Sequence, residues 1–180
     1  MHFSTAALLS LTTLVSGHGL ITSPPSRPVG DAIKAACGPA IAQNIQQDNT
    51  SHVEGLPEIA AQTKTQFHAD QCNLWLCKGL QFKDNAANVQ EYKTGDTVNI
   101  KVFLRIPHKG SANVSIVDTK SNTIIGQPLF DWPSGYADEK QKPNYPKNQT
   151  DFDVKIPDLG GKCATPGECV STIAISRIRE

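Results

Sequence analysis

The chain has 180 residues, of which 38% are hydrophobic and 19% charged, and this length suits one domain with a core of its own. Its 17 basic and 17 acidic residues balance, so no net field is present to attract nucleic acid or an anionic membrane surface. The balance is compatible with a neutral partner such as a polysaccharide.

An apolar leader opens the sequence. Residues 1–17 read MHFSTAALLSLTTLVSG, with an apolar run from Ala6 to Val15 and small residues directly before His18. The run is shorter than the roughly 20 residues of a membrane span, and the small residues fit a cleavage site. We expect residues 1–17 to be a secretory signal peptide rather than an N-terminal strand or core helix. Residues 18–180 are then one secreted, extracellular domain that begins with His18.

The first part of this domain has helical character. Residues 31–48, DAIKAACGPAIAQNIQQD, are rich in alanine. The Gly38-Pro39 pair predicts that the helix breaks and restarts there. The segment LPEIAAQTK, which begins at Leu56, predicts another short helix.

After about Glu91 the pattern changes to strands. In residues 96–106, DTVNIKVFLRI, every second side chain is apolar from Val98 onward, as is typical of a half-buried strand. Further strands are expected at residues 112–119, 122–130, 150–157 and 169–180, with Ile178 as the last apolar position. Short strands joined by turns predict a mainly β fold, an antiparallel β-sandwich with the helical N-terminal half inserted as long loops at one end.

Five cysteines indicate disulfide bonds in an oxidising compartment. They are Cys37, Cys72, Cys77, Cys163 and Cys169. Because the number is odd, one thiol lacks a partner, and the pairing stays open. A zinc site is the alternative, but CNLWLC and CATPGEC separate their cysteines by four and five residues, and no histidine follows at finger spacing.

Three glycosylation sequons begin at Asn49, Asn113 and Asn148. Each asparagine is expected on the surface if it is glycosylated in a secretory pathway. The sequons therefore add weight to secretion as a glycoprotein.

His18 becomes chemically special once the leader is removed. A free N-terminal histidine offers its α-amine and its ring Nδ1 to the same metal, and a second imidazole completes three nitrogens in the T arrangement that suits Cu(II). The unperturbed amine pKa is about 7.7–8.0, so a metal displaces its proton near neutral pH. If Gly17 stays attached, this site does not exist.

The second imidazole has three candidates. His108 lies in FLRIPHKGSANVSIVDT, after one predicted strand and directly before another, a position that is held rigidly yet open to solvent. His52 and His68 lie in the irregular half and are rivals, while an exposed turn histidine is the plain alternative for His108. Spacing favours His108 slightly.

Several motifs together resemble a known family. HGLITSPPSRPVGDAIKAACG, SHVEGLPE, CNLWLCKGLQ, IPHKGSANVSIVDT and TDFDVKIPDLGGKCATPGECV are similar to the fungal secreted lytic polysaccharide monooxygenases labelled chitin-binding type 4. The resemblance runs from His18 to about Val170 and covers nearly the whole mature chain. It implies an immunoglobulin- or fibronectin-like sandwich with one copper ion in a histidine brace on a flat end, held by His18 and His108.

The resemblance also implies an activity. Members of the family cleave β-1,4-linked glucan or chitin oxidatively, with hydrogen peroxide or oxygen and an external electron donor. The copper supplies the reactivity and the protein the geometry, so His18 and His108 are the expected catalytic as well as metal-binding residues. We expect a monomer with no nucleic-acid partner and no membrane span.

The C-terminal segment departs from the family pattern. The family has an aromatic-rich strand and a further cysteine after the position of Cys169, whereas this chain reads VSTIAISRIRE and has no aromatic residue after Phe152. A truncated or altered C-terminus accounts for both differences and for the odd cysteine. The loss of a strand would expose a sheet edge, which brings the activity of this chain into question.

Two other functions stay open on these residues. The first is a secreted copper-binding or carbohydrate-binding protein without catalysis, and the second is an inert secreted protein whose resemblance is ancestral. The aromatic residues Trp132, Tyr136 and Tyr145 are candidates for stacking on sugar rings, although Trp132 is expected in the core. No carboxylate pair stands out that would support a hydrolase.

Overall fold

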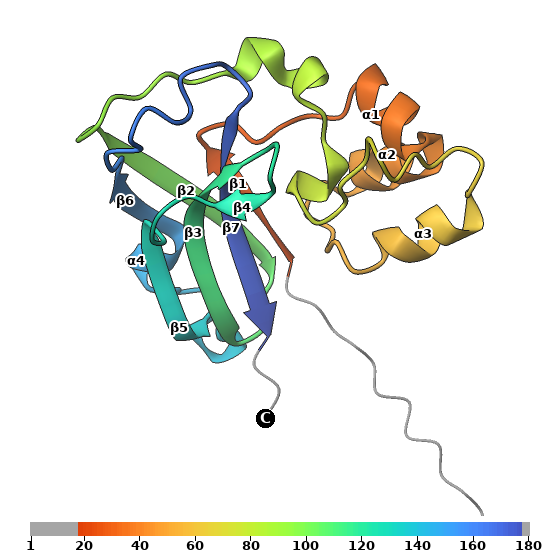
Figure 1. Cartoon of the computed structure of the whole chain (residues 1–180). Coiled ribbons are helices and arrows are strands. Elements are labelled where there is room, and N and C mark those ends of the chain that lie inside the picture. Colours follow the sequence, from red (N-terminus) through yellow and green to blue (C-terminus); the bar gives the residue numbers. More distant parts are fainter. Residues whose placement is uncertain (1–17, 178–180) are drawn as a thin grey trace, which may run out of the picture.

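A computed structural model describes residues 18–177 of the chain (Figure 1). The predicted signal peptide, residues 1–17, and the expected end of the last strand at Ile178 lie outside the described residues. Within residues 18–177 no helix has the length and apolar character that crossing a bilayer requires.

Two antiparallel sheets form the larger part of the molecule (Figure 1). The first has the strand order β1, β2, β6, which are His18–Ser23, Thr97–Ile106 and Asp151–Lys155. In the second sheet β3 pairs with β7 along its whole length on one side and with β4 and β5 on the other. These strands are β3 (Gly110–Asp118), β4 (Thr123–Ile124), β5 (Phe130–Tyr136) and β7 (Cys169–Arg177). The architecture is consistent with the predicted β-sandwich.

Alternating apolar side chains from both sheets form one core. On β2 the predicted alternation is confirmed, because Val98, Ile100 and Val102 are buried while Phe103 on the other face is exposed. Trp132 and Tyr136 of β5 pack in the same core, so the expectation of a buried Trp132 is confirmed. Neither aromatic side chain is available to stack on a sugar.

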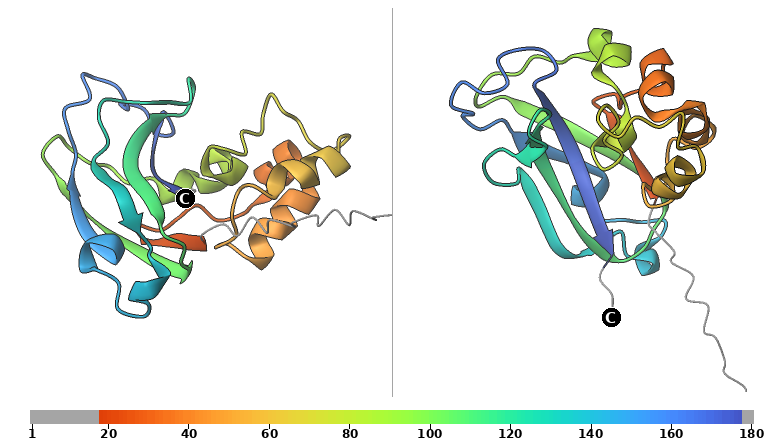
Figure 2. Two further views of the ribbon diagram at one scale, coloured as in Figure 1. Left: turned by 90° about the horizontal axis from the view of Figure 1, so that it is seen from below. Right: turned by 45° about the vertical axis from the view of Figure 1, so that its right-hand side comes forward.

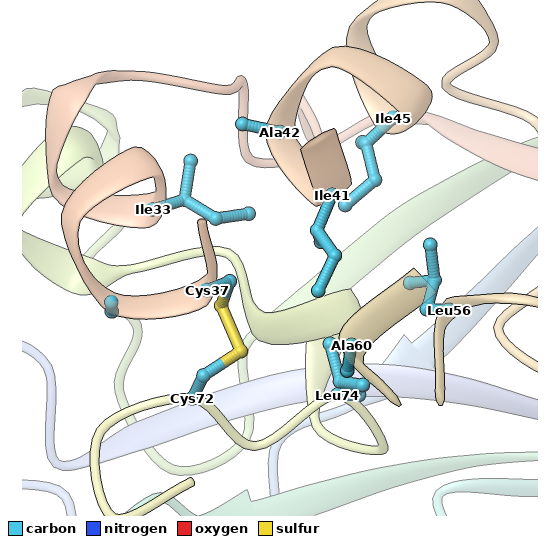
Figure 3. Close-up of a cluster of buried hydrophobic side chains, with 10 residues drawn as sticks. Ile33, Cys37, Ile41, Ala42, Ile45, Leu56, Ala60, Cys72 and Leu74 are labelled. Atoms are coloured by element: carbon cyan, nitrogen blue, oxygen red, sulfur yellow. A yellow bond between two sulfur atoms is a disulfide. The ribbon is translucent and has the colours of Figure 1, made fainter. Parts of the chain in front are cut away.

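A second core holds the helical half together, to one side of the sheets (Figure 2). Its helices are α1 (Asp31–Cys37), α2 (Pro39–Gln47) and α3 (Leu56–Gln62), and the 3-10 helices η1 (Cys77–Gly79) and η2 (Phe82–Asn88) follow. The break at Gly38-Pro39 and the short helix at Leu56 are confirmed. Figure 3 shows Ile33, Ile41 and Leu56 around the Cys37–Cys72 disulfide.

The prediction of one continuous strand at residues 122–130 is wrong. Only Thr123–Ile124 pairs with β3, and a new strand, β5, begins at Phe130. Gly126 adopts a positive φ of 70°, and Pro128 has no amide hydrogen to donate, so the chain leaves the sheet between them. The strand β1 and the short helices η3 (Glu139–Gln141) and α4 (Lys147–Thr150) were not expected either.

Two disulfides form, Cys37–Cys72 and Cys163–Cys169, and Cys77 is the unpaired thiol. Disulfides persist in oxidising compartments, and their presence is compatible with an extracellular protein. Gly79 lies against the first disulfide at a φ of +77°, where an added Cβ would be 2.7 Å from Cys37 Sγ and 2.8 Å from Cys72 Sγ. Only glycine fits this close approach.

The sequons differ in their environments. Asn49 and Asn148 are exposed, as expected of glycosylation acceptors. Asn113 is half-buried in the middle of β3, and its side-chain oxygen accepts a hydrogen bond of 2.9 Å from Ser115 Oγ. Asn113 is therefore less accessible as a glycosylation acceptor than Asn49 and Asn148.

The two disulfides are expected to contribute unequally to stability. Loop-closure entropy predicts a loss of about 4 kcal/mol on replacing Cys37 and Cys72 by alanine, and about 2 kcal/mol for Cys163 and Cys169, since the sequence separations are 35 and 6. Guanidinium unfolding of the two double variants measures the difference. An equal or larger loss for the short loop would contradict this ranking.

Candidate metal centre

His18 and His108 come together through the pairing of β1 with β2. His18 is the first residue of β1 and lies opposite Ile106, the last residue of β2. His108 follows only two residues after Ile106. The two histidines favoured from the sequence therefore lie at the same end of neighbouring strands, close enough for the charge of His108 to act on His18.

Each of these histidines has one buried ring nitrogen without a hydrogen-bond partner. The nitrogens are Nδ1 of His18 and Nε2 of His108. A buried imidazole nitrogen normally has a partner, because leaving it unpaired costs on the order of 1–3 kcal/mol. Both nitrogens are thus available to a ligand that accepts lone pairs, and a metal ion is such a ligand.

His52 also lies beside His18. Their ring centroids are 5.0 Å apart and the planes meet at 72°, while His52 Nδ1 and Glu54 Oε2 are 3.2 Å apart. A hollow of about 300 Å³ is lined by both rings and by the end of α2. His68, the other rival, does not line this hollow and lies in the loop before Cys72, where its backbone amide donates to Ala36.

A polar network holds the loop of His52 against β2. The carboxylate of Asp48, at the end of α2, accepts hydrogen bonds from the amide and hydroxyl of Thr50 and forms an ion pair with Arg105 of β2. Arg105 also donates to Thr50 Oγ1 at 3.0 Å. Lys78 Nζ donates to the carbonyl of Asn49 at 2.9 Å and fixes the same loop from its other side.

The environment of His18 disfavours its protonated ring. Burial is the largest cause that lowers its pKa below the ordinary value, and the charges of His52, Arg105 and His108 act in the same direction. Asp48 alone opposes them. A neutral imidazole is the form that binds a metal, so this environment suits a ligand.

Acidic and aromatic groups lie on the other side of the centre, next to His108. The amide of Lys109 donates to Glu139 Oε2 at 3.2 Å. The pKa of Glu139 is lowered first by a hydrogen bond from its own backbone amide, then by the bond from Lys109, and also by the charge of His108. The hydroxyl of Tyr145 is buried without a partner, and its pKa is raised by burial and by Glu139. Tyr145 was already a candidate for stacking on sugar from the sequence, whereas nothing in the sequence singled out Glu139, which a turn and the Lys142-Pro143 segment separate from Tyr145.

The donor set fits copper in one specific way. Across the described residues, no group of three or more His, Cys, Asp and Glu side chains is arranged to hold a metal ion. A histidine brace needs only two side chains, because its third nitrogen is the α-amine of the first residue. His18 Nδ1 and His108 Nε2 are buried imidazole nitrogens without a partner, and cleavage before His18 would provide the third nitrogen.

We expect Asp48→Asn to destabilise the fold by about 1 kcal/mol at pH 7, because the amide weakens a half-buried ion pair. Hydrogen bonds from Thr50 and the ion pair with Arg105 lower the pKa of Asp48. This contribution is present above the unfolded pKa and is lost as the pH falls through the folded one. Urea unfolding at pH 7 and pH 3 tests this.

Asp131→Asn is the matched control, because Asp131 is exposed and forms no hydrogen bond or ion pair among the described residues. Asp131→Asn is expected to change the free energy of unfolding only slightly at both pH values. If Asp48→Asn lowers the free energy of unfolding by the same amount at pH 3 and at pH 7, the ionised carboxylate does not have the stabilising role described here.

Comparison with known proteins does not assign a family or a function to this chain. No protein-family model matches the chain, and a search of the curated proteins finds no significant match. The function is therefore argued from the residues of the site.

Proposed function

We propose that this protein is a secreted, copper-dependent polysaccharide monooxygenase whose metal is held by His18 and His108. The observation that carries the proposal is the pair of buried, unpartnered ring nitrogens, His18 Nδ1 and His108 Nε2, at the shared end of β1 and β2. The motifs that resemble the lytic polysaccharide monooxygenases point to the same two residues.

Copper, when bound, supplies the redox chemistry with which oxygen or hydrogen peroxide oxidises a C–H bond of the sugar. The chain itself orients the ligands. Pairing of His18 with Ile106 fixes the first residue, and Pro107 restricts the backbone before His108. The packed ring of His52 limits the rotation of His18. Rigid ligands of this kind keep a metal site in its productive geometry.

The wider expectations from the resemblance belong to the same proposal. The two antiparallel sheets support an immunoglobulin-like sandwich, with the copper histidines at one end. The substrate class is a β-1,4-linked glucan or chitin, and an external donor supplies the electrons. The disulfides Cys37–Cys72 and Cys163–Cys169 support an extracellular site of action.

A secreted copper-binding protein without catalysis is the second candidate. The residues of β7, CVSTIAISR, contain no aromatic side chain, whereas the resemblance leads one to expect an aromatic residue beside the copper from this part of the chain. Tyr145 has a buried, unpartnered hydroxyl and lies close enough to Glu139 for the charge of that carboxylate to act on it. The two candidate functions differ in whether the copper-loaded protein oxidises a polysaccharide.

The first test is a calorimetric Cu(II) titration with parallel electron paramagnetic resonance spectra. We expect protein that begins at His18 to bind one copper tightly. One extra N-terminal residue or His108→Ala is expected to weaken binding at least about a hundredfold, because each removes one of three nitrogen ligands. His68→Ala, which alters a histidine outside the site, is the matched control and is expected to bind like the wild type.

Two outcomes decide between the candidates. Equal, weak binding by all four proteins would exclude the histidine brace. If the brace is present, copper-loaded protein with ascorbate and cellulose or chitin is expected to release oxidised oligosaccharides. Tight binding with no oxidised product from either polysaccharide would favour the non-catalytic candidate.

A further inference from the structure

A second, larger hollow lies on the opposite side of α3 from His18. It has a volume of about 760 Å³ and is bounded by α3, the loop of residues 67–75 and the turn after β3. Pro57 and Ala61 of α3 line it, whereas Gly55 and Ile59 line the hollow at His18. The two hollows share no lining residue, so the larger one is a separate feature of the surface.

Trp75 is the most conspicuous side chain of this hollow. It is 66% exposed, the largest exposed fraction among the large hydrophobic side chains described. Its amide donates to Asn73 Oδ1 at 3.1 Å, and its neighbours Cys72 and Leu74 are buried, Cys72 in the disulfide with Cys37. The indole is therefore presented to solvent from a braced turn. An exposed aromatic face on a rigid support is a feature of binding sites.

The opposite wall is fixed by hydrogen bonds of its own. Asp118 Oδ1 accepts from the amides of Lys120 and Ser121, each at 2.9 Å. Thr119 donates from its amide to the carbonyl of Glu168 at 2.9 Å and from its hydroxyl to that of Gly167 at 2.7 Å. Both walls are thus held independently of any ligand, which reduces the entropy that binding would cost.

The polar side chains of the hollow are mixed in kind. Lys64 and Lys120 donate hydrogen bonds, Asp70 accepts them, and the amide of Asn122 does both. In residues 18–177 none of these four side chains has a hydrogen-bond or ion-pair partner. Two lysines and one aspartate leave a net charge of only +1 among them, which is too weak a field to select a polyanion.

We propose that this hollow binds a short stretch of a neutral oligosaccharide, with one pyranose ring stacked on Trp75. The C–H face of a β-linked pyranose is apolar and matches the indole, while its equatorial hydroxyls both donate and accept hydrogen bonds. The polar side chains around the rim provide partners of both kinds. The choice of chitin or β-1,4-glucan as the oligosaccharide rests on the proposed function, whereas the site itself does not require copper.

The test uses metal-free protein whose first residue is His18. It is titrated separately with chitohexaose and with cellohexaose, and binding is measured by calorimetry and by tryptophan fluorescence. The other tryptophan, Trp132, is 6% exposed, so a blue shift and protection from acrylamide quenching report on Trp75. Trp75→Ala is expected to weaken binding at least about tenfold. Lys120→Ala, on the opposite wall, is expected to weaken it several-fold. Tyr92→Ala, an exposed aromatic residue that lines neither hollow, is the matched control.

The two proposals fail separately. His108→Ala is expected to lose copper yet keep its affinity for the oligosaccharide, because the hollow contains no copper ligand. Undiminished binding by Trp75→Ala, or no binding of either oligosaccharide at millimolar concentration, would overturn the saccharide site and leave the copper site untouched. Trp75→Ala is expected to fold, because the side chain that it removes is exposed. Its unfolding curve checks this.

Discussion

The pairing of β1 with β2 determines where the chemistry of this molecule lies. It places His18 opposite Ile106 and thereby two residues from His108, although ninety positions separate the two histidines in the sequence. Backbone hydrogen bonds fix this register, and a one-residue slip would turn His18 to the other face of the sheet. The candidate metal centre therefore depends on strand register before it depends on any side-chain interaction.

The two cores of the molecule meet at the same place. One core lies between the sheets and the other among the helices α1, α2 and α3. The ion pair of Asp48 with Arg105 joins the end of α2 to β2 beside His18. The helical half thus forms a wall of the metal centre on one face of α3 and a wall of the larger hollow on the other.

Alanine-rich composition and the Gly38-Pro39 break were sufficient to predict α1 and α2. Periodicity was sufficient for most strands, because each has an apolar face that packs on a core. It failed at residues 122–130, where apolar side chains continue past Gly126 and Pro128 although the backbone cannot stay in the sheet. His108 was correctly located at a strand end, but the position of Glu139, which accepts a hydrogen bond from the neighbouring amide of Lys109, depends on tertiary structure. The same holds for His52, whose place beside His18 is set by hydrogen bonds of Asp48 across the fold.

The single free thiol lies close to a disulfide that the helical core depends on. Cys77 is two residues from Gly79, whose α-carbon lies against both sulfurs of Cys37–Cys72. Burial raises the pKa of the Cys77 thiol, and only the thiolate attacks a disulfide. The packing around the half-buried Cys77 therefore lowers its thiolate fraction, and with it the rate at which this cysteine could attack Cys37–Cys72 and scramble the native connectivity.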